Sequence, residues 1–92
     1  MFSHTAVLRA ARGCAEPLGL CLDDLREPVQ RMAGCLGVEV RRVPHDAALW
    51  VLETRWQSAA AMQAFFLAPR LQQLLDRAVQ QGMLSGLDCE AA

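Results

Sequence analysis

The positions of apolar and polar residues predict four β-strands with helical segments between them. Val38–Val43 alternates between apolar and polar residues, a period of two that is typical of strands, and the mostly apolar run Ala48–Trp56 predicts the strongest strand. The turn sequence PHDA separates them, so the two strands are expected to form a hairpin. A short, moderately apolar run at Ser3–Ala10 predicts a first strand, and Leu84–Glu90, which contains Gly86, predicts a last one.

Alternation also divides the residues of Ala48–Trp56 between two faces of the expected sheet. One face carries Trp50, Leu52, Thr54 and Trp56, and the other carries Leu49, Val51, Glu53 and Arg55. We expect the first face to meet the helices and the second to meet a partner.

The segment Pro17–Gly34 has apolar residues at helical spacing. They are Leu18, Cys21, Leu22, Leu25, Val29, Met32 and Ala33. Gly34 and Gly37 supply stop signals at its end. Pro28 lies inside this segment, where it lacks a donor and clashes with the preceding turn, so we predict a kink or break near Arg26–Pro28.

A second helical region follows the third strand. Ser58 is suited to the N-cap position, because its hydroxyl can accept a hydrogen bond from a free N–H of the first turn. Pro69 then starts another helix at its first position. The apolar stripe of that helix consists of Leu71, Leu74, Leu75, Ala78 and Val79, and Gly82 closes it.

The predicted order of elements is β-α-β-β-α-β in a single domain, residues 1–92. This order is that of the ferredoxin-like α+β fold, in which helices cover one face of an antiparallel sheet. The other face would be bare. Apolar residues make up 53% of the chain, more than a lone domain of 92 residues easily hides, so we expect a homodimer through the sheet face.

Charge and hydropathy exclude several classes of partner. Nine basic and ten acidic residues are interspersed, which argues against nucleic-acid binding. No apolar run approaches the ~18 residues of a membrane span, and no signal-peptide pattern opens the chain, so a cytoplasmic protein is expected. The four cysteines are far apart without a C-x-x-C motif, so we expect free thiols and no metal site.

The chain contains no lysine, asparagine, isoleucine or tyrosine, which is typical of a GC-rich bacterial genome. Only His4 and His45 have an unperturbed pKa near neutrality. His45 falls in the predicted turn beside Asp46, where a solvated side chain is expected. His4 falls on the first strand, facing either a pocket or a partner sheet, and is the candidate base.

Residues Gly34–Leu75 resemble the antibiotic biosynthesis monooxygenase domain family. The shared pattern is Gly-Cys-Leu-Gly before the second strand, an acidic residue and Trp at the end of the third, Trp-x-Ser, an Ala-rich helix, and a Pro at the next helix. The resemblance implies a dimeric α+β barrel, with a pocket between sheet and helices. It also implies oxidation of aromatic polyketides or quinols by molecular oxygen, without metal or flavin, while some relatives degrade haem.

The resemblance also matches Trp56 to the tryptophan that lines the pocket of oxygenating members. The histidine often found in the following helix is replaced by Phe65 or Phe66, and the Asn and Tyr of oxygenating members have no counterpart. The predicted site therefore has His4 as base and Arg55, or another arginine, as holder of the developing oxyanion. The predicted substrate-binding residues are Trp56, Trp50, Leu52, Met62 and Phe65.

Two functions from different classes fit these residues. The first is a cofactor-independent monooxygenase acting on a flat aromatic or quinol substrate. The alternative is a non-catalytic dimeric module that binds a small apolar ligand or only keeps the fold. A haem-related role would depend on His4 and His45 as nitrogen ligands.

The junction ETRWQSAAAMQAFF, Glu53–Phe66, is expected to border a cavity lined by Trp56, Leu52 and Met62. The competing outcome is that one of the two phenylalanines fills this space and leaves a dry core.

Overall fold

The computed structural model describes residues 2–91 as one sheet with helices on one side. The elements are β1 (Phe2–Ala10), α1 (Ala15–Gln30), β2 (Cys35–Arg42), β3 (Leu49–Trp56), α2 (Ala59–Phe66), α3 (Pro69–Gln80) and β4 (Leu84–Ala91). Each predicted strand and helix is present. Ser58 caps α2 as predicted, since its side chain accepts a hydrogen bond from the N–H of Ala61, and Pro69 opens α3.

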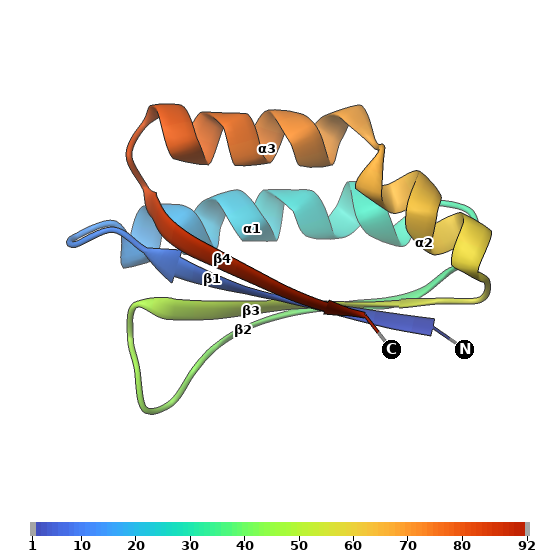
Figure 1. The fold of residues 1–92 in the computed structure, drawn as a ribbon, viewed down its shortest axis with the longest axis horizontal. Helices are drawn as coiled ribbons and strands as arrows, with labels where there is room; N and C mark the ends of the chain where they lie inside the picture. The colour runs from blue at the N-terminus through green and yellow to red at the C-terminus, as the bar shows by residue number, and fades with distance from the viewer. Residues whose placement is uncertain (1, 92) are drawn as a thin grey trace.

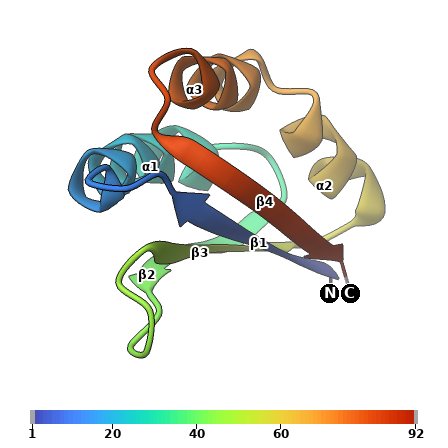
Figure 2. The same cartoon turned by 60° about the vertical axis from the view of Figure 1, so that its left-hand side comes forward.

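The strands form an antiparallel sheet in the order β2-β3-β1-β4. Helices α1 and α3 lie over the same face, and the shorter α2 lies near the end where β3 finishes (Figure 1). Turning the molecule shows all three helices on one side of the sheet, with the opposite face uncovered (Figure 2). This arrangement confirms the predicted ferredoxin-like α+β fold.

The register of the sheet confirms the predicted faces of β3. His4 of β1 pairs with Thr54, and Leu8 pairs with Trp50, so these four residues share the helix-facing side. Thr54 is fully buried there, whereas Arg55 is exposed on the other side.

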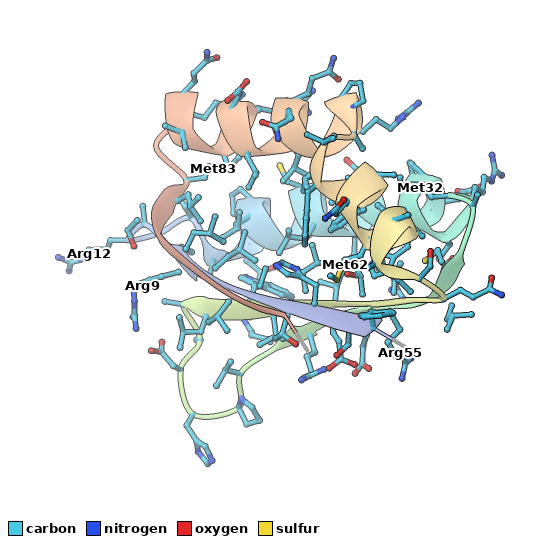
Figure 3. All side chains as sticks on the ribbon, turned by 45° about the vertical axis from the view of Figure 1, so that its right-hand side comes forward. Arg9, Arg12, Met32, Arg55, Met62 and Met83 are labelled. Carbon is cyan, nitrogen blue, oxygen red and sulfur yellow. The ribbon has the colours of Figure 1, made fainter. Side chains whose placement is uncertain are left out.

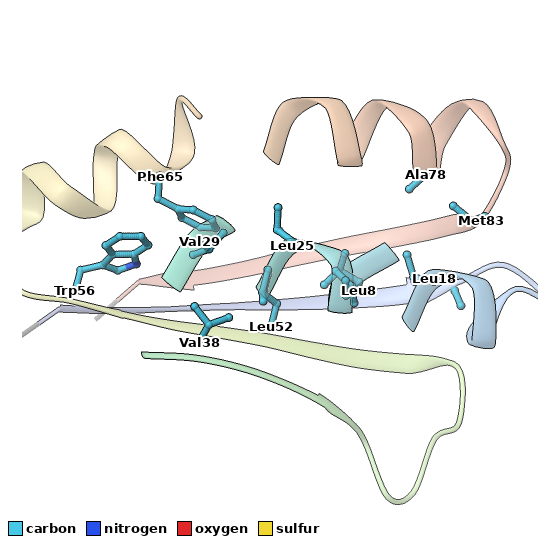
Figure 4. Packing of buried hydrophobic residues seen from close by; sticks show 13 residues of the cluster. Leu8, Leu18, Leu25, Val29, Val38, Leu52, Trp56, Phe65, Ala78 and Met83 are labelled. Atoms are coloured by element: carbon cyan, nitrogen blue, oxygen red, sulfur yellow. The ribbon is translucent and has the colours of Figure 1, made fainter. Parts of the chain in front are cut away.

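The core fills the layer between sheet and helices. Its buried residues include Leu8, Leu18, Leu22, Leu25, Val29, Val38, Leu52, Trp56, Phe65, Ala78 and Met83 (Figure 4). The α1 members recur every three or four residues, so one stripe of the helix packs on the sheet.

Of the predicted kink or break near Arg26–Pro28, the break is wrong, and the kink stays a prediction. Helix α1 continues from Ala15 to Gln30 with Pro28 in its last turn, where the N–H of Arg31 donates to the carbonyl of Glu27 and the N–H of Met32 donates to that of Val29. A proline removes only the donor to the residue four positions earlier, which here is Asp24. Asp24 is solvent-exposed, so losing this hydrogen bond leaves no buried polar group behind.

Candidate functional site

A cavity of about 200 Å³ lies between the sheet and the helices. Its floor comes from β1 and β3 of the sheet, its walls come from α1, α2 and β4, and its roof comes from α3. The lining residues are His4, Ala6, Leu8, Leu22, Leu52, Phe65, Phe66, Leu71, Gln72, Leu74, Leu75 and Leu87. All but two of these side chains are apolar, so the cavity suits an apolar ligand with few polar groups.

His4 is the polar side chain on the floor of this cavity. It is only 8% exposed, and its Nδ1 has no hydrogen-bond partner among the described residues. Its ring lies edge-on to Phe66, with centroids 4.7 Å apart, and to Phe65 at 6.5 Å. Burial lowers the pKa of His4 below 6.5, because desolvation disfavours the charged form. At neutral pH the imidazole is therefore uncharged and able to accept a proton.

The two phenylalanines at the end of α2 lie in different surroundings, one in the core and one in the cavity wall. Phe65 is buried and stacks on Trp56, with ring centroids 5.2 Å apart (Figure 4). Trp56 is itself fully buried, and its Nε1 donates to Oγ1 of Thr54 at 2.9 Å. The prediction that Trp56 lines the cavity is thus corrected, because Phe65 covers its ring. Phe66 is half-buried and forms part of the cavity wall.

Two other predicted ligand-binding residues also lie outside the cavity lining. Met62 is half-buried and packs against the core cluster from α2 (Figure 3). Trp50 donates its Nε1 to the carbonyl of Ala15 at 2.9 Å, while the guanidinium of Arg42 lies 5.0 Å from its ring centroid. Trp50 therefore anchors the start of α1 to the sheet.

Arg55 is not near His4. His4 pairs with Thr54, and the next residue of the strand must point to the opposite face because side chains alternate. Arg55 accordingly lies on the uncovered side of the sheet (Figure 3). His45 is exposed in the β2–β3 turn, which projects away from the helices (Figure 1). Of the predicted site residues, the structure brings together His4, Leu52 and Phe65.

Sequence reasoning missed the parts of the cavity lining that α3 and β4 contribute. The stripe Leu71, Leu74 and Leu75 was visible in the sequence, but only as the apolar face of a helix. No pattern in the sequence indicated that Gln72 lines the cavity. Its Nε2 donates to the carbonyl of Phe66 at 3.0 Å, which ties the end of α2 to α3.

A larger depression of about 840 Å³ lies between α1 and the α2–α3 connection, and charged side chains line much of it. Part of that charge is internally compensated, since Arg31 pairs with Glu27. We take the smaller cavity as the candidate site, because it is the one in which a buried titratable group meets apolar walls.

Neither a metal centre nor a membrane segment is evident in the described part of the chain. Among the side chains that the structure describes, which end at residue 87, no three or more His, Cys, Asp or Glu are grouped so that they could hold a metal ion. No described helix has the length and apolar character needed to cross a membrane.

The fold and its apolar cavity define a ferredoxin-like α+β protein with a buried histidine in a ligand-sized site. Residues 1–77 match the sequence model of the family described as antibiotic biosynthesis monooxygenase. The chain belongs to this family, as the Gly34–Leu75 pattern indicated. A search of curated protein sequences found no significant match.

Solved structures confirm the fold at low sequence identity. A protein from Deinococcus radiodurans, assigned by name to the same family, aligns with a TM-score of 0.92 at 20% identity, covering 100% of this chain and 90% of its own. A protein from Pseudomonas aeruginosa aligns with a TM-score of 0.88 at 23% identity, covering 99% and 90%. A protein from Shewanella oneidensis gives 0.92 at 16% identity, covering 99% and 87%.

Proposed function

We propose that this protein is a cofactor-independent monooxygenase that oxidises a small, flat aromatic or quinol substrate, with His4 as the base. One observation carries the proposal: a buried histidine, uncharged at neutral pH, lines an otherwise apolar cavity, and its Nδ1 has no partner in the described structure. Membership of the antibiotic biosynthesis monooxygenase family supports the class of reaction.

The cavity has the size and lining for an aromatic ring. A cavity of about 150 Å³ in another protein is large enough to bind benzene, so the 200 Å³ found here accommodates a ring with substituents. Phe66 offers a ring to an incoming aromatic molecule, and such pairs add about 1 kcal/mol beyond burial. The sheet supplies a floor between His4 and Leu52.

The chemistry assigned to the protein is proton removal in a dry site. His4 accepts a proton from an acidic C–H that a neighbouring phenolic hydroxyl or carbonyl activates. The resulting carbanion gives one electron to molecular oxygen, and the two radicals combine to a peroxide anion. This anion takes the proton back from the imidazolium of His4 and becomes a hydroperoxide. Loss of water leaves one oxygen atom in the product, so a CH₂ group and O₂ become a carbonyl and water.

The walls of the cavity favour these reaction steps in two ways. Apolar side chains such as Leu52 and Leu75 exclude water, so the carbanion is not reprotonated by solvent. The imidazolium formed on His4 then balances the anion at close range, in surroundings where charges interact more strongly than in water. The role predicted for Arg55 is therefore not required in this scheme.

Oxygen consumption tests the proposal directly. Purified protein is mixed with a series of hydroquinones and naphthols, and the rate of oxygen consumption is compared with the uncatalysed rate. His4→Ala should lower turnover by about 100-fold or more, the usual contribution of a general base. His45→Ala is the matched control, because this exposed histidine lies in the β2–β3 turn, and its turnover should be unchanged. No turnover above the uncatalysed rate would refute the enzyme proposal.

A second function, binding a small apolar ligand without turnover, is favoured by the scarcity of polar groups in the lining. Besides His4 only Gln72 is polar, and its amide already donates to Phe66. Saturable binding of a naphthol, measured by calorimetry without oxygen uptake, would support this second function and reject the first.

We also propose that two copies pair through the uncovered face of the sheet. Val7 and Leu49 lie half-buried on this face, and Glu39 lies directly opposite Glu53, where like charges destabilise a sheet. Glu39 is paired with Arg41 of its own chain at 3.3 Å, whereas Glu53 has no ion-pair partner among the side chains that the structure describes. Arg55, exposed on the same face, can pair with Glu53 of the other copy.

Sedimentation at micromolar concentration should give twice the chain mass of 10.1 kDa. Leu49→Glu should weaken the dimer, while the control Leu20→Glu, on an exposed helix position, should leave it intact. A monomer of the wild-type protein would contradict this proposal.

A further inference from the structure

We propose that Phe66 sets the upper size of the ligand at two fused rings. Together with the apolar lining, it limits the cavity to uncharged phenols with one ring or two fused rings. This inference rests on the proposed binding of an aromatic ligand beside His4, but not on its turnover. It assigns a specificity-determining role to the residue at the end of α2.

The ring of Phe66 is held in place on two sides. Its centroid lies 4.7 Å from that of His4, at 70° between planes, and 5.7 Å from that of Phe65. Both neighbours are buried, so the Phe66 ring has no room to retreat toward the sheet. A wall that cannot retreat toward the sheet limits how far a ligand extends on that side.

The backbone behind this wall is also fixed. The Phe66 carbonyl accepts a hydrogen bond from Gln72 Nε2 at 3.0 Å, which links the end of α2 to the first turn of α3. Ala68 donates its N–H to the carbonyl of Phe65 at 3.1 Å, and Leu67 donates to Gln63 at 3.2 Å. The end of α2 is therefore closed by several hydrogen bonds on both sides of Phe66.

The volume of the cavity sets the number of rings. About 150 Å³ is enough for benzene, and 200 Å³ leaves space for substituents or one fused ring, but not for two more. A third ring would stay outside the cavity and bury no further apolar surface. Replacing Phe66 with alanine removes a benzene-sized group from the wall, so it should create room for one additional ring.

The lining also selects against charged ligands. No arginine side chain lines the cavity among the described residues, and the chain has no lysine. A carboxylate would lose its hydration without gaining a cationic partner, whereas a single hydroxyl can hydrogen-bond to His4. The fitting ligands are accordingly neutral phenols such as naphthols.

Calorimetric titration under nitrogen tests the size limit separately from catalysis. The ligands are phenol, 1-naphthol, 9-phenanthrol and 1-naphthoate. For the wild type we expect 9-phenanthrol and 1-naphthoate to bind at least about tenfold more weakly than 1-naphthol. Phe66→Ala should reverse the order of 1-naphthol and 9-phenanthrol. The control Leu67→Ala changes the adjacent, 79% exposed residue, and should leave the order as in wild type.

Two results would overturn the inference. One is a wild type that binds 9-phenanthrol as tightly as 1-naphthol, and the other is a folded Phe66→Ala protein with the wild-type order. Phe66→Leu, which keeps an apolar side chain in the wall, serves as the second variant if the alanine protein does not fold, and should move the ratio in the same direction by a smaller factor. Size-limited binding without oxygen uptake would retain this inference and reject the monooxygenase.

Discussion

Replacing His4 with leucine removes a buried polar atom, Nδ1, that has no hydrogen-bond partner in the described part of the chain. Such a group costs the folded state about 1–3 kcal/mol, because it gives up water and gains nothing in return. His4 also lines a cavity, so a branched apolar side chain can be accommodated without overpacking. We therefore expect His4→Leu to abolish activity and to stabilise the protein.

The expected gain in the free energy of unfolding is about 1–2 kcal/mol. Each kcal/mol raises the Tm of a domain of this size by roughly 4–8 °C. Thr54 offers a matched control with the opposite sign. It is the residue directly across from His4, it is fully buried, and its Oγ1 accepts the hydrogen bond of Trp56 at 2.9 Å. Thr54→Val leaves the indole N–H without a partner and should cost about 1–3 kcal/mol.

Thermal and urea unfolding followed by circular dichroism measure both changes. The protein concentrations must be equal, because any dimer contributes to stability by mass action. If His4→Leu lowered stability as much as Thr54→Val, His4 would have a stabilising role in the fold. The observation that carries the proposed function would then be lost.

Two further predictions concern pH and helix packing. Since burial lowers the pKa of His4, the unfolded chain binds more protons than the folded one as the pH falls below 6.5, so this residue makes stability decline there. Urea midpoints at about pH 7.5 and about pH 5.5 should differ more for the wild type than for His4→Leu, and equal differences would contradict the buried, neutral state. Gly19→Ala should destabilise the protein, because the new Cβ would lie 2.6 Å from Cη2 of Trp50, and overpacking of about 1–3 kcal/mol outweighs a helix-propensity gain of about 1 kcal/mol. Calorimetry should show a lower Tm for Gly19→Ala. The control Leu20→Ala, at an exposed position, should change the free energy of unfolding by less than about 0.5 kcal/mol. A higher Tm for Gly19→Ala would show that Trp50 does not pack there.

The sequence by itself determined the elements and the faces of β3. Alternation placed Leu52, Thr54 and Trp56 on one side and Arg55 on the other, and the structure has the same division. Ser58 and Pro69 marked the starts of α2 and α3 correctly. These features depend on backbone periodicity and on capping groups within a few residues, so they can be read locally.

The position of Pro28 near the end of α1 explains why the helix is not broken there. The sequence showed a proline among helical residues, but not that the helix would end two residues later. Near a helix end a missing N–H leaves an exposed carbonyl, which water can satisfy, whereas in the middle of a buried helix it would not.

Only the tertiary structure decided where the cavity lies. Trp56 and Met62 were expected in its wall, but Phe65 points inward and stacks on Trp56. Phe66 and the leucines of α3 enclose the space beside His4. A cavity is the volume left after side chains from distant segments have packed together. Its walls therefore follow from the joint placement of β1, α2 and α3, which no local period of the sequence encodes.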